Sequence, residues 1–320
     1  MDGLLNRRHL LQALAAAGLG TGPLLLSRTL ADENADPLTR MVAAIFFDSY
    51  ATAAFKGALR YAGDDGFVAS LPQLLHARVN AGYDNVIWNT WFTANSEESV
   101  VTTPQGHHVV VVVHGGGVFG TPERLERSYR ANLDRSNTDG LTGQYAAKIS
   151  SREARDLLDH GKLPDGSTIP MYAFDEIGEG STPVPMRHGI VLDYQLAKKS
   201  TSGYEQFRNL RRDPLMIARA GGPEAAEVYL DKAAARHDTR RMGSFHPFNR
   251  IDPDQPQTRL LNLGGNQGGL NSEGKDQGLG LGYDLDWGIS GNNGLVDMAR
   301  YVAVAPRNPS KSLQYLDFEI

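Results

Sequence analysis

The stretch Val109–Thr121, VVVVVHGGGVFGT, decides how we interpret this chain. Five consecutive valines are typical of a strand that is buried on both faces. The strand leads into His114 and a glycine-rich bend, which ends at Thr121-Pro122-Glu123. That ending is typical of a helix start, because it supplies a capping hydroxyl, a proline at the first helical position and a carboxylate in the first turn.

A strand that passes through bare backbone into a helix N-terminus is a common way to build a pocket for an anion or an oxyanion. We therefore expect the active or binding loop in this stretch. The expected anion-binding residues are Gly115, Gly116, Gly117, Gly120 and Thr121. The alternative is that the glycines only permit a tight, crowded connection.

Three side chains are the expected catalytic groups. His114 stands at the carboxyl end of the valine strand, where ligands gather in open sheets, and would act as acid/base or ligand. Asp175 and Glu176 follow the predicted strand Thr168–Phe174 and stand at its carboxyl end, where paired carboxylates favour acid/base or metal chemistry. The alternatives are a histidine bonded to backbone and two carboxylates on a solvated loop.

The glycine loop matches two known motifs in part. Gly115–Gly120 fits G-x-G-x-x-G, but no second strand ending in an acid follows, so a standard nicotinamide site is not expected. His114-Gly115-Gly116-Gly117 resembles the oxyanion-hole motif of lipases and esterases of the α/β-hydrolase fold, which implies loop amides that stabilise a negative oxygen. The nucleophile elbow G-x-S-x-G is missing: Ser290 is the only serine with a glycine two residues before it, but Asn292 stands two residues after it where the motif needs glycine, and no histidine follows His246. The chain is therefore not expected to be a standard α/β-hydrolase.

Residues 1–31 are expected to form an export signal. Arg7-Arg8 precedes an uncharged apolar run, Leu10–Leu26, and Thr29-Leu30-Ala31 offers a small-residue cleavage site. Asn6–Leu11 resembles a twin-arginine export signal. The resemblance implies the twin-arginine export machinery as a partner and a periplasmic or secreted protein. The alternative is a membrane anchor, but glycine and proline within the run argue against a stable membrane span.

Composition excludes several classes of function. Cysteine is absent from the 320 residues, which removes disulfides, thiolate nucleophiles and zinc–thiolate sites. The formal net charge is −5, so no broad basic field is present to hold nucleic acid. With 41% hydrophobic and 22% charged residues the chain is an ordinary globular one.

For residues 32–320 we expect a single globular domain of the α/β or α+β class, with a mixed sheet, an antiparallel hairpin, flanking helices and a long glycine-rich loop region. The hairpin is predicted from Val100–Thr103 and His108–Val113 around the turn Pro104-Gln105-Gly106. The predicted helices cover 38–63, 71–81, 122–134, 150–161, a stretch beginning at Asp213-Pro214, and 223–237. The other predicted strands are 85–92, 168–174, 186–196 and 313–320, with an ordered stretch at 295–305.

Periodicity fades from Asp238 to Asn293, and Gly264–Gly294 holds 11 glycines in 31 residues. So long a stretch without elements is typical of a functional loop system. Asp284 and Asp286 are weak metal candidates there, because Ile289 and Leu295 stand where an EF-hand requires glycine and an acid. The cofactor is unknown from the sequence, and a metal ion is the candidate that these carboxylates leave open.

Two functions fit these observations. The first is an exported soluble enzyme, a hydrolase or lyase, acting on a small-molecule or oligomeric extracytoplasmic substrate through the loop 114–121. The second is an exported non-catalytic protein that binds a ligand, metal or polymer through region 264–294. Clustering of His114, Asp175 and Glu176 in one concave pocket would favour the enzyme.

Overall fold

The computed structural model describes residues 41–48, 50–133, 146–178, 184–236, 241–246, 248, 252–264, 275–283 and 299–306. The helices are α2 (Ala51–Ala62), α3 (Leu71–Asn80), α4 (Val86–Asn89), α5 (Pro122–Leu133), α6 (Ser151–His160), α7 (Phe174–Gly178), α8 (Tyr194–Lys198), α9 (Phe207–Leu210), α10 (Pro214–Ala220) and α11 (Pro223–Ala234). The strands are β1 (Met41–Asp48), β2 (Phe67–Val68), β3 (Phe92–Thr102), β4 (His108–His114), β5 (Ala146–Lys148), β6 (Met171–Ala173), β7 (His188–Asp193), β8 (Gly203–Gln206), β9 (Arg241–Phe245), β10 (Gln257–Leu263), β11 (Lys275–Tyr283) and β12 (Ala299–Pro306).

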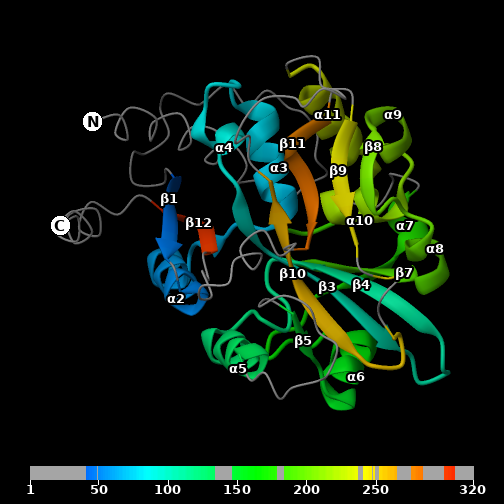
Figure 1. Cartoon of the computed structure of the whole chain (residues 1–320). Helices are drawn as coiled ribbons and strands as arrows, with labels where there is room; N and C mark the ends of the chain where they lie inside the picture. The colour runs from blue at the N-terminus through cyan, green and yellow to red at the C-terminus, as the bar shows by residue number, and fades with distance from the viewer. Residues whose placement is uncertain are drawn as a thin grey trace.

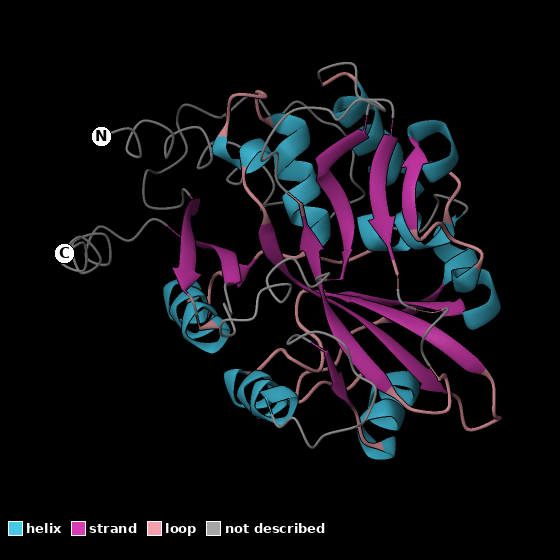
Figure 2. Ribbon diagram, in the orientation of Figure 1, coloured by secondary structure: helices cyan, strands magenta, loops and turns pink. Residues whose placement is uncertain are grey.

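The strands form two sheets, with helices packed around them (Figures 1 and 2). The large sheet has the order β6-β7-β4-β3-β10-β11-β9-β8, and β5 also pairs with β10. Its β6–β7 and β9–β11 pairs are parallel and the others are antiparallel. The small sheet has the order β1-β12-β2 and is antiparallel. This arrangement is α+β and confirms the expected mixed sheet.

Elements with strong local signals are confirmed. The hairpin pairs β3 with β4 from Ser96↔His114 to Thr102↔His108, around the predicted turn. Helix α6 begins at Ser150, whose side chain accepts a hydrogen bond from the Glu153 amide while Glu153 bonds back to the Ser150 amide. Such a capping box satisfies amides that the first helical turn leaves without a backbone partner. Helices α10 and α11 also begin at the predicted prolines.

The predicted helix 38–63 is wrong in its first half. Met41–Asp48 is strand β1, and the helix begins only at Ala51. The strand pairs over all eight residues with β12, from Met41↔Pro306 to Asp48↔Ala299. Apolar residues at 41, 42, 45 and 46 suit either period, so pairing with a strand from the far end of the chain decides the outcome.

The predicted strand 85–92 is also wrong. Asn85 accepts a hydrogen bond from the Ile87 amide, 3.0 Å, and begins the short helix α4. Trp88 is fully buried in that helix. The strand instead begins at Phe92 and runs through the polar residues Asn95–Ser99. A capping asparagine outweighed the aromatic and β-branched pattern that had favoured a strand.

Two further strands are shorter than expected. Of the predicted strand 168–174, only Met171–Ala173 is extended, and of 186–196 only His188–Asp193. Helices α7 and α8 take over at Phe174 and Tyr194. At the second boundary the Asp193 carboxylate accepts bonds from the Gln195 and Leu196 amides, so a capping acid ends the strand.

The region 238–293 contains three strands that were not predicted. Strand β10 pairs with β3, β5 and β11, and β9 lies between β11 and β8. Their sequences RMGSF, QTRLLNL and KDQGLGLGY are polar or glycine-rich, so their neighbours in the sheet rather than their own periodicity define them. The export signal 1–31, the predicted strand 313–320 and the metal candidates Asp284 and Asp286 lie outside the described residues.

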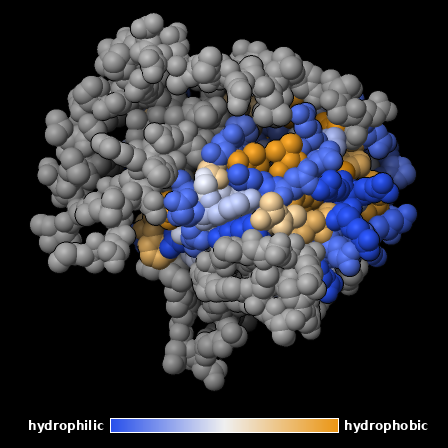
Figure 3. All heavy atoms as spheres, turned by 90° about the horizontal axis from the view of Figure 1, so that it is seen from above, coloured by the Kyte–Doolittle hydropathy of each residue, from blue (hydrophilic) through white to orange (hydrophobic). Residues whose placement is uncertain are grey.

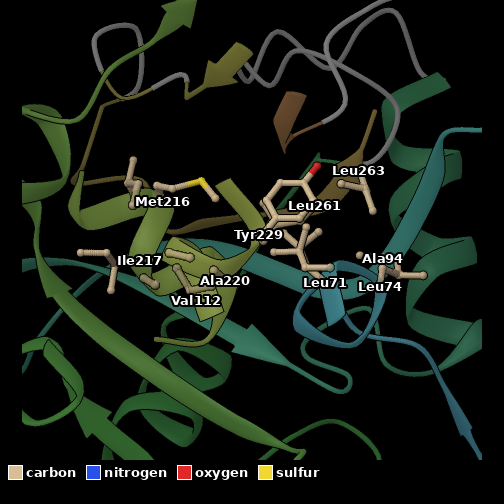
Figure 4. Packing of buried hydrophobic residues seen from close by; sticks show 14 of the residues in the cluster. Leu71, Leu74, Ala94, Val112, Met216, Ile217, Ala220, Tyr229, Leu261 and Leu263 are labelled. Carbon is tan, nitrogen blue, oxygen red and sulfur yellow. The ribbon is translucent and has the colours of Figure 1, made fainter. Parts of the chain in front are cut away.

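The core lies on both faces of the valine strand. Val110 and Val112 face a large cluster with α3, α10 and α11, of which Figure 4 shows Val112, Leu71 and Tyr229. Val109, Val111 and Val113 face a second cluster with α6. Full burial of one such side chain stabilises the fold by about 1.5–3 kcal/mol, so β4 anchors the loop that follows it.

Two further observations concern the surface of the described structure and the length of its helices. The face seen from above in Figure 3 carries hydrophobic side chains among hydrophilic ones. Within the described ranges, no helix is long and apolar enough to cross a membrane.

Candidate functional site

The predicted loop lies against the central strand β3. Gly115 and Gly116 have positive φ angles of 82° and 102°, a backbone conformation that glycine adopts without strain. Both amides donate to the Asn95 carbonyl oxygen, at 2.9 and 3.1 Å. A Cβ atom at Gly115 would lie 2.6 Å from Cγ of Arg187, so the connection is crowded as well as tight.

A carboxylate from inside the protein occupies the next two amides of the loop. Val118 and Phe119 each donate to the Glu97 carboxylate at 2.6 Å, and the Thr258 hydroxyl donates to it at 3.2 Å. A Cβ atom at Gly117 would lie 2.5 Å from Oε2 of Glu97. The loop therefore binds a carboxyl group, and that group belongs to the fully buried Glu97 of the neighbouring strand.

Glu97 is a perturbed group. Burial raises its pKa from 4.5 to about 7, and the Phe119 and Val118 amides, Thr258 and the Arg124 charge oppose that rise. Desolvation disfavours the charged form of a carboxyl group, while amide donors favour it. Glu97 therefore changes its charge near neutral pH.

The last predicted loop residues support the helix that follows. The Gly120 amide donates to the Gly117 carbonyl at 3.0 Å. The Thr121 hydroxyl accepts a bond from the Arg124 amide at 3.3 Å, and the Leu125 amide donates to the Thr121 carbonyl at 3.1 Å. Thr121 thus acts as the N-cap of α5.

His114 is fully buried at the end of β4. Its Nε2 lies 2.9 Å from the Ala218 carbonyl oxygen and its Nδ1 lies 2.9 Å from Ser96 Oγ. Because a carbonyl only accepts, Nε2 carries the proton and Nδ1 accepts from the Ser96 hydroxyl. Ser96 Oγ accepts in turn from the Leu71 amide, so each polar atom in this series of hydrogen bonds has a partner.

A second histidine lies beside the first. The rings of His114 and His188 have centroids 4.9 Å apart, and His188 is buried too. Burial, with the nearby His188, lowers the pKa of His114 to about 3, and burial lowers that of His188 to about 4. His188 Nδ1 bonds to the Pro185 carbonyl at 2.7 Å, while its Nε2 is a buried atom with no hydrogen-bond partner among the described residues. Both imidazoles are neutral at ordinary pH.

The structure places the two predicted carboxylates elsewhere. Asp175 and Glu176 are exposed in the first turn of α7, and Glu176 accepts a bond from the Ala173 amide at 2.7 Å. Both nitrogens of the His114 ring bond to Ser96 and Ala218 instead. The structure therefore brings neither carboxylate into hydrogen-bonding contact with the histidine. The part of the chain that the structure describes also holds no group of three His, Asp or Glu side chains suited to a metal ion.

Sequence reasoning missed the polar run Asn95–Ser99 of β3. Glu98 points to the opposite face from Glu97 and forms a buried bidentate ion pair with Arg219 of α10, at 2.8 and 3.1 Å. Ser99 donates to Thr258 at 2.8 Å. The signal that could have found these residues is the run of five consecutive polar positions, Asn95–Ser99, between Ala94 and Val100 and shortly before the hairpin turn.

Comparison with known proteins identifies the fold. No family model matches the chain, and no curated protein matches it. A solved structure from work on how the C-type lectin fold accommodates massive sequence variation in Nanoarchaeota is similar, with a TM-score of 0.55 and 24% identity over 84% of this chain and 100% of that chain. The likeness shows an α+β fold of the C-type lectin kind.

Proposed function

We propose that this protein is an exported, non-catalytic binding protein on a C-type lectin scaffold, with its ligand surface in the glycine-rich region 264–294. The observation that carries the proposal is the occupied loop. Val118 and Phe119 already bind Glu97, and Gly115 and Gly116 already bind Asn95. A hydrolase or lyase would need loop amides aimed at a substrate and an accessible base, so these contacts favour the binding protein.

Strand ends in the described structure support the location. Strand β10 ends at Leu263 opposite Phe92, and β12 begins at Ala299 opposite Asp48. Next to these ends, the Arg300 guanidinium lies over the rings of Phe47 and Trp91, 4.8 and 4.9 Å from their centroids. An exposed ring with a stacked cation offers both apolar contact and hydrogen-bond donors to a ligand.

The fold is consistent with a stable frame that carries a separate ligand-binding region. The similar solved structure concerns a fold that accommodates massive sequence variation. We extend that description to this chain: the sheets supply a stable frame, and the glycine-rich region supplies the sequence that contacts the ligand. Binding sites are often carried by loops on a rigid scaffold.

Binding can be tested with purified exported protein and a defined panel of probes. We expect one of three immobilised polysaccharides, dextran, chitin or polygalacturonate, to retain the protein saturably. Arg300→Gln should weaken retention at least tenfold, while Arg152→Gln, an exposed arginine on α6, should leave it unchanged. Turnover of p-nitrophenyl acetate that disappears in His114→Gln would support the enzyme instead and overturn the proposal.

Export is proposed from the leader and tested separately. In a bacterial host with twin-arginine machinery, Arg7→Lys combined with Arg8→Lys should retain the full chain in the cytoplasm, because the paired arginines are the signal. Arg28→Lys serves as the control and should still be exported. Unchanged export of the double variant, measured by immunoblotting of cell fractions, would overturn this part of the proposal.

A further inference from the structure

Within the part of the chain that the structure describes, strand β1 has one edge that pairs with no other strand. Among the described residues it pairs with β12 alone, in a register without shifts over eight residues. Its sequence, MVAAIFFD, contains no lysine or proline, the residues that commonly protect sheet edges. A long, regular and apolar edge is a template for one more strand.

The two faces of β1 differ in chemistry. On one face Ile45 and Phe47 are 36% and 51% exposed, and they are two of three exposed large hydrophobic side chains that the structure describes. On the other face Phe46 packs on α2, next to Gly57 and 5.4 Å from the Tyr61 ring. Helix α2 also carries exposed Lys56 and Arg60 one turn apart. An added strand would lie beside apolar side chains on one face and on the side of helix α2 on the other.

We propose that Leu313–Ile320 of this same chain binds the free edge of β1 as an additional strand. In this segment Leu316, Phe318 and Ile320 alternate with Asp317 and Glu319. Period-two alternation puts the apolar side chains on one face of a strand and the acids on the other. The apolar face would lie beside Ile45 and Phe47, and the face that carries Asp317 and Glu319, together with Leu313 and Tyr315, would lie on the side of helix α2, whose exposed residues include Lys56 and Arg60.

The connection has the length that this placement needs. Pro306 lies opposite Met41, so the chain leaves β12 beside the start of β1. Reaching the far edge of β1 means crossing two strand spacings, about 10 Å. The six residues 307–312 can span about 20 Å when extended. Leu313–Ile320 then runs parallel to β1, eight residues beside eight, as in β-strand addition. The inference shares Phe47 with the proposed ligand site, but its test uses no ligand, so the two proposals can fail separately.

Hydrogen exchange tests the proposal directly. Alternate amides of β1 point away from β12, and in the full chain we expect them to exchange at least tenfold more slowly than in a chain that ends at Ser312. Amides that point toward β12 should not change and serve as the internal control. Adding the synthetic octapeptide LQYLDFEI to the shortened chain should restore slow exchange. Equal exchange of the outward amides in both chains would overturn the proposal.

Point variants separate the occupant from alternatives. Phe318→Asp should speed exchange of the outward β1 amides as the deletion does, whereas Gln314→Ala should not. Asp317→Lys combined with Glu319→Lys should also speed this exchange, because it would put two more positive charges on the side of α2, which already carries Lys56 and Arg60. Protection that persists in the shortened chain and grows with protein concentration would assign the edge to a second copy and overturn the proposal.

Discussion

Glu97 and Glu98 are neighbours on β3, and both are buried, but they are held in different ways. Glu97 accepts hydrogen bonds from neutral donors, the Val118 and Phe119 amides and the Thr258 hydroxyl, and the Arg124 charge also favours its ionised form. Glu98 faces the full positive charge of Arg219. The comparison teaches that backbone dipoles can hold a buried carboxylate while leaving its charge dependent on pH, whereas an ion pair makes each partner dependent on the other.

The largest effect is expected on the Glu98 side. Glu98→Ala leaves Arg219 buried without its carboxylate, and removing one partner of a buried pair costs about 3–5 kcal/mol. Urea denaturation measures the change in the free energy of unfolding. The control is Asp156→Ala, which removes an exposed pair with Arg152 and should cost under about 0.5 kcal/mol. A loss below about 1 kcal/mol for Glu98→Ala would contradict the ion-pair half of the comparison.

The buried histidines give the next effect. The pKa of His114 is lowered from 6.5 to about 3. Between these pH values His114 is protonated in the unfolded chain but neutral in the native protein. Native stability therefore falls on acidification, by about 3 kcal/mol at pH 4 from this group. In His114→Gln the loss of stability between pH 7 and pH 4 should be smaller. Identical pH profiles for the two proteins would show that His114 titrates normally.

Glu97 should act with the opposite sign. A carboxyl pKa raised from 4.5 to about 7 means that the native protein holds the proton more tightly than the unfolded chain does. Stability from this group is present below pH 4.5 and is lost as pH rises to 7, by about 3 kcal/mol. Relative to the wild type, the free energy of unfolding of Glu97→Gln should rise by about this amount between pH 5 and pH 8. A stability difference that does not vary with pH would show that Glu97 is an ordinary carboxylate.

The smallest effect separates crowding from backbone strain. Gly117→Ala places a Cβ atom 2.5 Å from Glu97, and overpacking of this kind costs about 1–3 kcal/mol. Gly106 has a φ of 84° but nothing within 4 Å of the added atom, so Gly106→Ala reports strain alone, about 1 kcal/mol. Combining Gly117→Ala with Glu97→Ala should recover part of the loss. Thermal unfolding of the wild type, the three single variants and the double variant measures these effects, and an additive double variant would place the clash elsewhere.

Local signals explain what the sequence predicts well. The turn at Pro104–Gly106, the Ser150–Glu153 capping box and the helix starts at Pro214 and Pro223 depend on residues within four positions of each other. Such interactions can be read along the chain without knowledge of the fold. Strands β1 and β10 depend instead on partners far away in sequence, β12 and β3. Their own residues fit more than one structure, so the pattern could not define them.

The same reasoning explains the candidate site. The sequence predicts anion binding by Gly115, Gly116, Gly117, Gly120 and Thr121, whereas the amides that hold the Glu97 carboxyl group are those of Val118 and Phe119. The carboxylate could not be identified because β3 had not been predicted to pass through Asn95–Ser99. His114 illustrates a related limit. A strand-end position is compatible with a reactive histidine and with a structural one. The contacts of His114 with Ser96, Ala218 and His188 in the structure are needed to show that its side chain is buried and neutral.

The central claim is that Glu97 occupies the glycine loop, and the amide resonances of Val118 and Phe119 test it most directly. In the wild type both proton shifts should titrate together with a midpoint near the Glu97 pKa of about 7, and in Glu97→Gln the transition should disappear. Adding 10-fold excess inorganic phosphate at pH 8 should move neither resonance, because the donors are engaged. Amide proton shifts that stay constant between pH 5 and pH 8 but change when phosphate is added would contradict the account.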